Sequence, residues 1–188
     1  MSAPARRMLV RDRTATTNRA KTLTLDLLKR QAAVRLKQIA RQLDALDAQA
    51  RALVVADPLL ARRLAVLTSI PGLGEITAIA LIADMPELGQ MDAKHAASLA
   101  GLAPVARQSG TWRGKSFIRG GRAHLRQALY MPALVAARFN PDLKARFNAM
   151  TAAGKPAKVA ITALMRRLIV LANALLRDDR TWTQRASA

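Results

Sequence analysis

Residues 25–53 read LDLLKRQAAVRLKQIARQLDALDAQARAL, and apolar residues recur along this stretch at steps of three and four. Such spacing puts one apolar side chain per turn on a single helical stripe, as in a coiled coil or a helical hairpin. We therefore predict a coiled-coil helix over residues 22–56. Its stripe either joins two subunits or packs back against the chain's own domain, and the pattern favours neither. The stripe consists of Leu25, Leu28, Ala32, Leu36, Ile39, Leu43, Leu46, Ala50 and Leu53.

The composition of the whole chain also favours helices. Hydrophobic residues make up 51% of the 188 residues but aromatics only 3%, so Ala, Leu, Ile, Val and Met must build the core. We predict a mainly α protein with a flexible basic N-terminus over 1–21, the helix 22–56, a compact helical domain over 57–182 and a tail over 183–188. We identify no apolar run near the roughly 20 residues that span a bilayer. The absence of cysteine excludes disulfides and fits a reducing cytoplasm.

Positive charge dominates the second half of the chain. Lys and Arg number 31 against 12 acids, for a formal net charge of +19. Between Lys94 and Arg177 there are 15 basic residues and one acid, Asp142. A segment of one sign repels itself unless an anion neutralises it, and nucleic acid is the anion that such charge favours over a membrane surface.

The run Ile70-Pro71-Gly72-Leu73-Gly74 precedes a predicted helix over 75–83 and has the pattern of a helix-hairpin-helix turn. Its glycines allow close backbone approach, and the free N–H groups of the next helix can hold a phosphate. The same run also suits a tight turn chosen only for packing. Both readings stay open.

Residues 104–118 interrupt the helical rhythm and suit a small β-hairpin or an ordered loop. Ser109 lies there among basic residues, without a neighbouring acid. Arginines could favour its alkoxide and bind the phosphate oxygens, which is the chemistry of serine attack on a phosphodiester. The alternative is that Ser109 and Gly110 only make a turn, and Ser116 is a similar candidate.

The sequence offers no metal site. Acids are sparse in the second half, and His95 and His124 have no ligand spacing around them. His124 lies between Arg122 and Arg126 and fits a surface or phosphate contact better than a metal ligand.

Several runs together resemble the insertion-sequence-110 family of transposases, over roughly residues 25–182. The similar runs are GLAP at 101–104, QSGTWRG at 108–114, IRGGR at 118–122 with LR at 125–126, ALYMPALV at 128–135, GKPAKVA at 154–160 and the hairpin at 70–74. Proteins of this family pair an N-terminal RuvC-like domain, which carries metal-binding carboxylates, with a C-terminal domain that carries a nucleophilic serine. A coiled coil between the two domains supports oligomerisation.

The resemblance implies a DNA transposase that recombines the ends of an insertion element, with Ser109 as nucleophile and Gly72, Leu73 and Gly74 as the hairpin turn. It also implies DNA and a structured guide RNA as partners, without a membrane, in the nucleoid region of a bacterial cytoplasm. A second subunit is expected, either another copy or a full-length transposase. By position and charge, six bases are expected to contact the DNA backbone: Arg107, Arg113, Lys115, Arg119, Arg122 and Arg126.

The RuvC-like domain does not occur among these residues, so we expect no cofactor here, and the resemblance implies a divalent metal for that domain alone. The alternative function is that of a non-catalytic DNA- or RNA-binding remnant, which would occupy element ends or pair with a complete enzyme. A basic structural protein of chromatin or ribosomes would explain the charge but not the loop 108–114.

Overall fold

The computed structural model describes residues 3–105, 108–109, 112–114 and 117–183. The described chain is mainly α, as predicted, with short strands between its fifth and sixth helices. It divides into two compact units, Met1–Pro58 and Leu59–Ala188, which are taken in turn.

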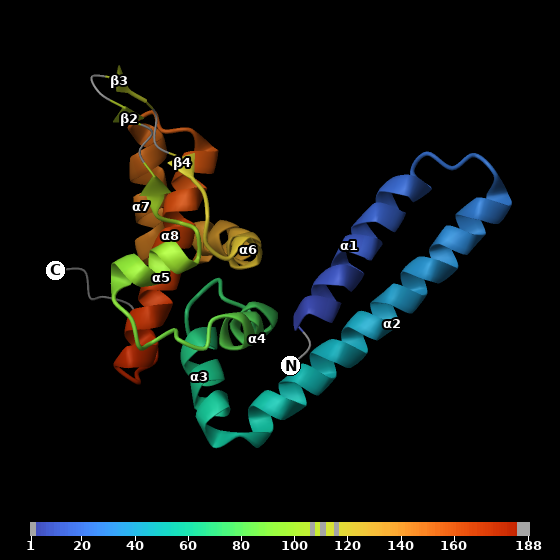
Figure 1. The fold of residues 1–188 in the computed structure, drawn as a ribbon, viewed down its shortest axis with the longest axis horizontal. Helices are drawn as coiled ribbons and strands as arrows, with labels where there is room; N and C mark the ends of the chain where they lie inside the picture. The colour runs from blue at the N-terminus through green and yellow to red at the C-terminus, as the bar shows by residue number, and fades with distance from the viewer. Residues whose placement is uncertain (1–2, 106–107, 110–111, 115–116, 184–188) are drawn as a thin grey trace. The chain divides into compact units, whose positions relative to one another are not determined.

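The first unit is a helical hairpin in which α1 (Ala3–Ala20) lies along α2 (Asp26–Ala56) (Figure 1). Ile39 and Leu43, in the middle of the predicted stripe, are buried, whereas Leu25 and Leu53 at its ends are exposed. Arg6 Nε donates to Asp47 Oδ1 at 2.5 Å across the hairpin. The stripe therefore packs within its own unit over its middle, and a coiled coil between subunits stays a prediction.

The prediction of a flexible N-terminus was wrong, because residues 3–20 form α1. This segment has no apolar stripe of its own, so the sequence pattern indicated disorder. Its helix is stabilised instead from outside, by packing along α2 and by the Arg6–Asp47 ion pair. The favourable helix propensity of Ala, Arg, Met and Leu also contributes.

The second unit contains six helices and four two-residue strands among its described residues. In chain order these are α3 (Pro58–Thr68), α4 (Glu75–Asp84), α5 (Ala93–Leu99), β1 (Pro104–Val105), β2 (Gln108–Ser109), β3 (Trp112–Arg113), β4 (Phe117–Ile118), α6 (Ala123–Phe139), α7 (Pro141–Ala152) and α8 (Ala157–Arg177). Asp92 and Asn140 cap α5 and α7 by accepting from backbone N–H groups three residues on, so these helices start where short polar side chains satisfy their first turns.

Helix α8 is the centre of this unit, and α5, α6 and α7 all pack on it. Ile161, Leu164, Leu168 and Leu175 are buried, at the spacing that puts them on one face of the helix. By length and composition alone α8 could cross a membrane, contrary to our expectation that no run approaches that length. Half of its apolar window is nevertheless buried inside the protein, which is the pattern of a core helix.

A buried amide fixes the loop before α5 onto α8. Asn173 is 2% exposed; its Oδ1 accepts from the N–H of Gly89 at 2.7 Å, and its Nδ2 donates to the carbonyl of Met91 at 2.7 Å. Both of its polar ends are satisfied, so the cost of burying the amide is offset. The loop 85–92 is thereby held against the helix that carries the core.

Candidate functional site

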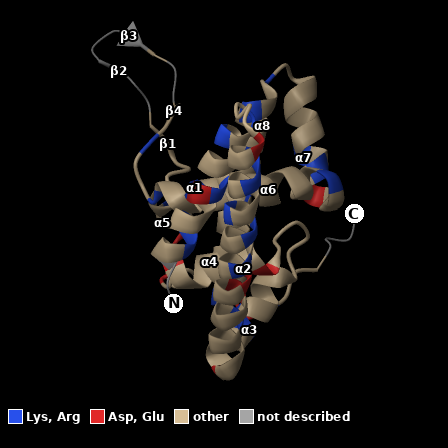
Figure 2. Cartoon of the chain, turned by 90° about the vertical axis from the view of Figure 1, so that its right-hand side faces the viewer, with Lys and Arg blue, Asp and Glu red and all other residues tan. Residues whose placement is uncertain are grey.

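Ser109 lies in a narrow antiparallel ribbon. β2 pairs with β3 so that Ser109 is opposite Trp112 and Gln108 is opposite Arg113. Closer to the helices, β1 pairs with β4, with Pro104 opposite Ile118 and Val105 opposite Phe117. The two pairs form one excursion of the chain with β2 and β3 farthest out (Figures 1 and 2). The prediction of a small β-hairpin over 104–118 is confirmed in backbone terms.

At Ser109 and Arg113 the structure describes the strand backbone. Two predicted DNA contacts, Arg107 and Lys115, lie outside the described residues, as does Ser116. Arg119 follows β4 and is exposed. The roles of Ser109 and its basic neighbours as site residues thus remain predictions.

A contact between two glycines closes the base of the ribbon. Gly121, after β4, lies against Gly101, before β1; a Cβ on Gly121 would come 2.6 Å from both the Gly101 Cα and the carbonyl oxygen of Ser98. Arg126 on α6 donates to the carbonyls of Gly101 and Gly120, each at 3.1 Å. The guanidinium therefore joins the two ends of the excursion.

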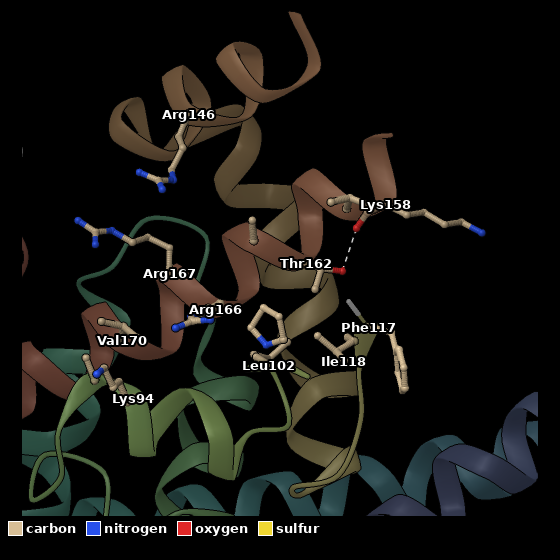
Figure 3. A pocket seen from close by; sticks show the side chains of 14 residues that line it. Lys94, Leu102, Phe117, Ile118, Arg146, Lys158, Thr162, Arg166, Arg167 and Val170 are labelled. Carbon is tan, nitrogen blue, oxygen red and sulfur yellow. Dashed lines mark hydrogen bonds between the residues drawn. The ribbon is translucent and has the colours of Figure 1, made fainter. Parts of the chain in front are cut away.

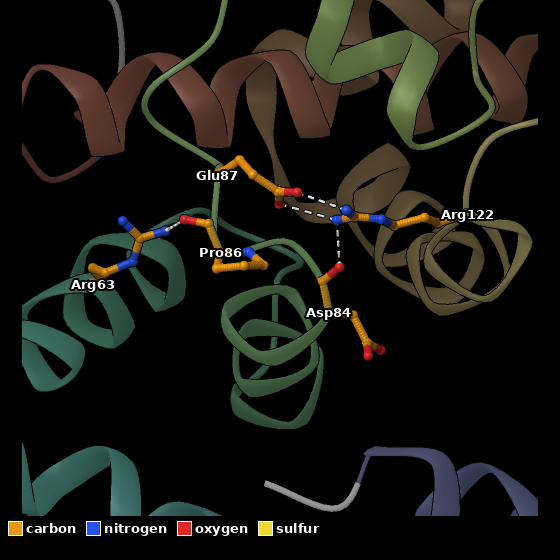
Figure 4. A network of polar contacts seen from close by, with 5 residues as sticks. All are labelled: Arg63, Asp84, Pro86, Glu87 and Arg122. Atoms are coloured by element: carbon orange, nitrogen blue, oxygen red, sulfur yellow. Dashed lines mark hydrogen bonds and ion pairs between the residues drawn. The ribbon is translucent and has the colours of Figure 1, made fainter.

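Arg122 is held in a second network (Figure 4). Its guanidinium donates to both carboxylate oxygens of Glu87, at 2.6 and 3.0 Å, and to the carbonyl of Asp84 at 2.7 Å. The hydrogen bonds from Arg122 to its carboxylate, together with one from its own backbone, lower the pKa of Glu87 to about 2. Arg63 on α3 donates to the carbonyls of Pro86 and Leu88, so the loop after α4 is tied to two helices.

The engagement of Arg122 and Arg126 bears on their predicted contacts with DNA. Both guanidinium groups make hydrogen bonds within the chain that position the base of the ribbon. A phosphate would have to share donors that already have partners. Their roles as DNA contacts remain predictions, and positioning the ribbon is the role that the geometry describes.

The Ile70–Gly74 turn is packed against α6. Gly72 has φ +100°, and a Cβ there would meet the Ala136 backbone at 2.8 Å, while Leu73 is only 3% exposed. The close approach of Gly72 to Ala136 supports the reading in which the turn was chosen for packing. Gly74 faces open space at the start of α4, but Glu75 places an acid in that first turn, which opposes a phosphate there. Phosphate binding at this turn stays a prediction.

A basic groove that sequence reasoning did not single out lies beside the ribbon base (Figure 3). Its volume is about 820 Å³, and α5, α7, α8 and the strands β1 and β4 contribute to its lining. Five cations line it, called here the groove cations: Lys94, Arg146, Lys158, Arg166 and Arg167. They were missed because they lie far apart in the sequence; the adjacent pair Arg166 and Arg167 within an apolar helix was the available signal. Figure 2 shows such basic residues on α7 and α8.

Part of the groove lining is apolar. It consists of Leu102, Pro104, Phe117, Ile118, Val159 and Val170. Phe117 is 41% and Val159 is 50% exposed, which is high for side chains of this kind. The groove therefore combines positive charge and exposed apolar surface in one lining.

The described part of the chain contains no group of three or more His, Asp or Glu side chains placed to hold a metal ion. His124 lies on α6 with its Nε2 3.6 Å from Asp84 Oδ2, and His95 Nδ1 lies 3.0 Å from Asp92 Oδ2. Each histidine thus lies beside one acid. Asp92 caps the helix that carries His95, whereas Asp84, beside His124, is the last residue of α4.

A family model described as the Transposase IS116/IS110/IS902 family matches residues 64–148, a span that includes the hairpin turn and the whole ribbon. The resemblance to this family of transposases is thereby confirmed. The chain is 35% identical over 169 residues to an insertion element IS110 protein of Streptomyces coelicolor, covering 89% of the chain and 41% of that relative.

Two further relatives extend the comparison. The pilin gene-inverting protein of Moraxella bovis is 36% identical over 145 residues, covering 74% of the chain and 45% of that protein. An insertion element IS900 protein of Mycobacterium paratuberculosis is 36% identical over 123 residues, covering 62% and 30%. The chain thus spans less than half the length of each of these relatives.

Proposed function

We propose that this chain is the serine-bearing part of a DNA transposase or recombinase. The observation that carries the proposal is the family match over residues 64–148, which contains the ribbon with Ser109. Two related proteins are named for insertion elements and one for inverting a pilin gene, and rearrangement of DNA is common to both descriptions. The net charge of +19 supports a polyanionic substrate.

In the proposed reaction the Ser109 hydroxyl attacks a phosphodiester of DNA. The serine oxygen forms a bond to phosphorus and releases its proton to solvent or to a base. The bond from phosphorus to one deoxyribose oxygen breaks, and that oxygen leaves as a hydroxyl after gaining a proton. Arginine side chains near the ribbon would stabilise the charge that develops on the non-bridging oxygens.

Trapping a covalent complex tests this step. The chain is incubated with duplex DNA of an element end that carries a sulfur-bridged scissile phosphate, and adducts are resolved on a denaturing gel. We expect an adduct with the native chain and none with Ser109→Ala, while Ser116→Ala, which removes the other candidate serine, retains it. An adduct that persists in Ser109→Ala would overturn the assignment of the nucleophile.

A second candidate is a protein that holds nucleic acid without cutting it. It is supported by the groove cations, together with the lack of a clustered set of acids in the described residues. This function predicts salt-dependent binding in gel-shift experiments, with no adduct from any variant. An adduct with the native chain excludes it. Partners such as a guide RNA or a second subunit belong to the same set of proposals.

A further inference from the structure

The groove beside the ribbon offers charges without local partners. No acidic residue lines it, and within the described residues none of the groove cations takes part in an ion pair. Arg146 and Arg167 extend toward one end of the groove, and Lys158 and Phe117 lie toward the other (Figure 3). A ligand that satisfies these charges must be anionic at both ends, as a phosphodiester chain is.

The apolar part of the groove lining distinguishes a single strand from a duplex. Paired DNA presents its phosphates to a protein surface but keeps its base faces stacked inside. Unpaired bases expose flat apolar faces, which stack on aromatic side chains while cations follow the backbone. Phe117 lines the groove and is 41% exposed, so its ring is available to the face of an unpaired base. The volume of about 820 Å³ is sufficient for a few nucleotides.

The groove is also close to Ser109 along the chain. Pro104 of β1 lines the groove, and the five residues of extended chain from there to Ser109 span at most about 17 Å. A strand bound in the groove would therefore lie a few nucleotides from a phosphate at the serine.

We propose that the groove binds an unpaired DNA strand next to the phosphodiester attacked by Ser109. The position relative to the reaction rests on the proposed function, but the binding itself does not. It is therefore measured on Ser109→Ala, in which chemistry is removed. Failure of the adduct assay and failure of groove binding are then separate results.

The test measures fluorescence anisotropy of a labelled oligothymidylate, with a blunt duplex and an oligouridylate of equal length as competitors. Arg167→Glu is expected to weaken binding of the oligothymidylate about tenfold and to lower the salt slope by about one or more. Arg138→Glu is the matched control, because Arg138 is an exposed arginine of α6 outside the groove lining and the change in net charge is the same. This control should lose about twofold or less.

Phe117→Ala is expected to weaken binding at least fivefold, and Phe117→Trp to restore it, which separates stacking from a general effect on folding. Loss in the alanine variant together with rescue by tryptophan supports the proposal. Equal competition by duplex, or oligothymidylate binding that is indifferent to residue 117, overturns it in favour of a general phosphate-binding surface. Tighter binding of the oligouridylate overturns the assignment to DNA in favour of RNA.

Discussion

Replacing Gly121 by alanine tests the closed base of the ribbon most directly. Gly121 has φ +59°, a backbone conformation that costs an L-residue with a side chain about 1–2 kcal/mol. The added methyl would also meet the backbone of Gly101 and the carbonyl oxygen of Ser98. Backbone atoms of a closed turn yield less readily than the end of a flexible side chain, so the clash requires the two ends of the ribbon to separate.

The adjacent Gly120 provides a matched control. Its φ of +72° imposes the same conformational cost, but no atom lies within 4 Å of a Cβ built there. Gly120→Ala should therefore lose about 1–2 kcal/mol of unfolding free energy. Gly121→Ala should lose about 2–5 kcal/mol, because forced overpacking adds about 1–3 kcal/mol. The difference between the two variants isolates the contact with Gly101.

The assay is thermal unfolding followed by tryptophan fluorescence, since both tryptophans, Trp112 and Trp182, belong to the second unit. A difference of about 1–3 kcal/mol corresponds to a shift in Tm of roughly 3–12 °C for a unit of this size. Equal losses in the two variants would refute the reasoning, because they would mean that the two ends of the ribbon do not touch.

Three further changes probe other contacts. Gly72→Ala should lower the unfolding free energy by about 2–4 kcal/mol, because Gly72 lies close to α6. Gly74 has open space around it, so Gly74→Ala should change the unfolding free energy by less than about 1 kcal/mol. Similar losses in the two variants would contradict the packing role of the turn. Glu87→Gln should lower the unfolding free energy by about 1 kcal/mol at neutral pH, a value reduced because the ion pair is exposed to solvent. The difference in unfolding free energy from the native chain should shrink as pH falls from about 4.5 toward 2, because folding lowers the pKa of this carboxylate to about 2. A pH-independent difference would exclude the ion pair as its cause. Asn173→Ala should cost about 2–3 kcal/mol and increase amide exchange in the loop before α5, because it leaves the partly buried N–H of Gly89 and carbonyl of Met91 without their partner. Unchanged exchange would contradict this.

The helices that carry their own signals could be predicted from the sequence. α8 has an apolar stripe at helical spacing, and Asn140-Pro141 marks the start of α7 by a cap and a proline. α1 could not be predicted in this way, because its stability comes from α2 rather than from its own pattern. A helix that depends on a partner carries a weak local signal.

The candidate site divides in the same way. The motif resemblance suggested Ser109 as the nucleophile, and that role stays a prediction. Arg122 was expected to contact DNA because its charge can be read from the sequence. Its partner Glu87 lies 35 residues away in the chain, so their hydrogen bonds could be identified only from the folded structure. The groove cations meet only after α5, α7 and α8 have packed, so no local pattern brings Lys94 and Arg167 together.

The glycine contact at the base of the ribbon has a consequence for how proteins of this kind diversify. Because residues 101 and 121 meet, the chain leaves and re-enters the helical body at one point. Lengthening a loop whose ends are already joined costs little, about 0.6 kcal/mol for each doubling. A ribbon of different length could therefore be accommodated at residues 101 and 121 at little entropic cost, with the helices beneath unchanged.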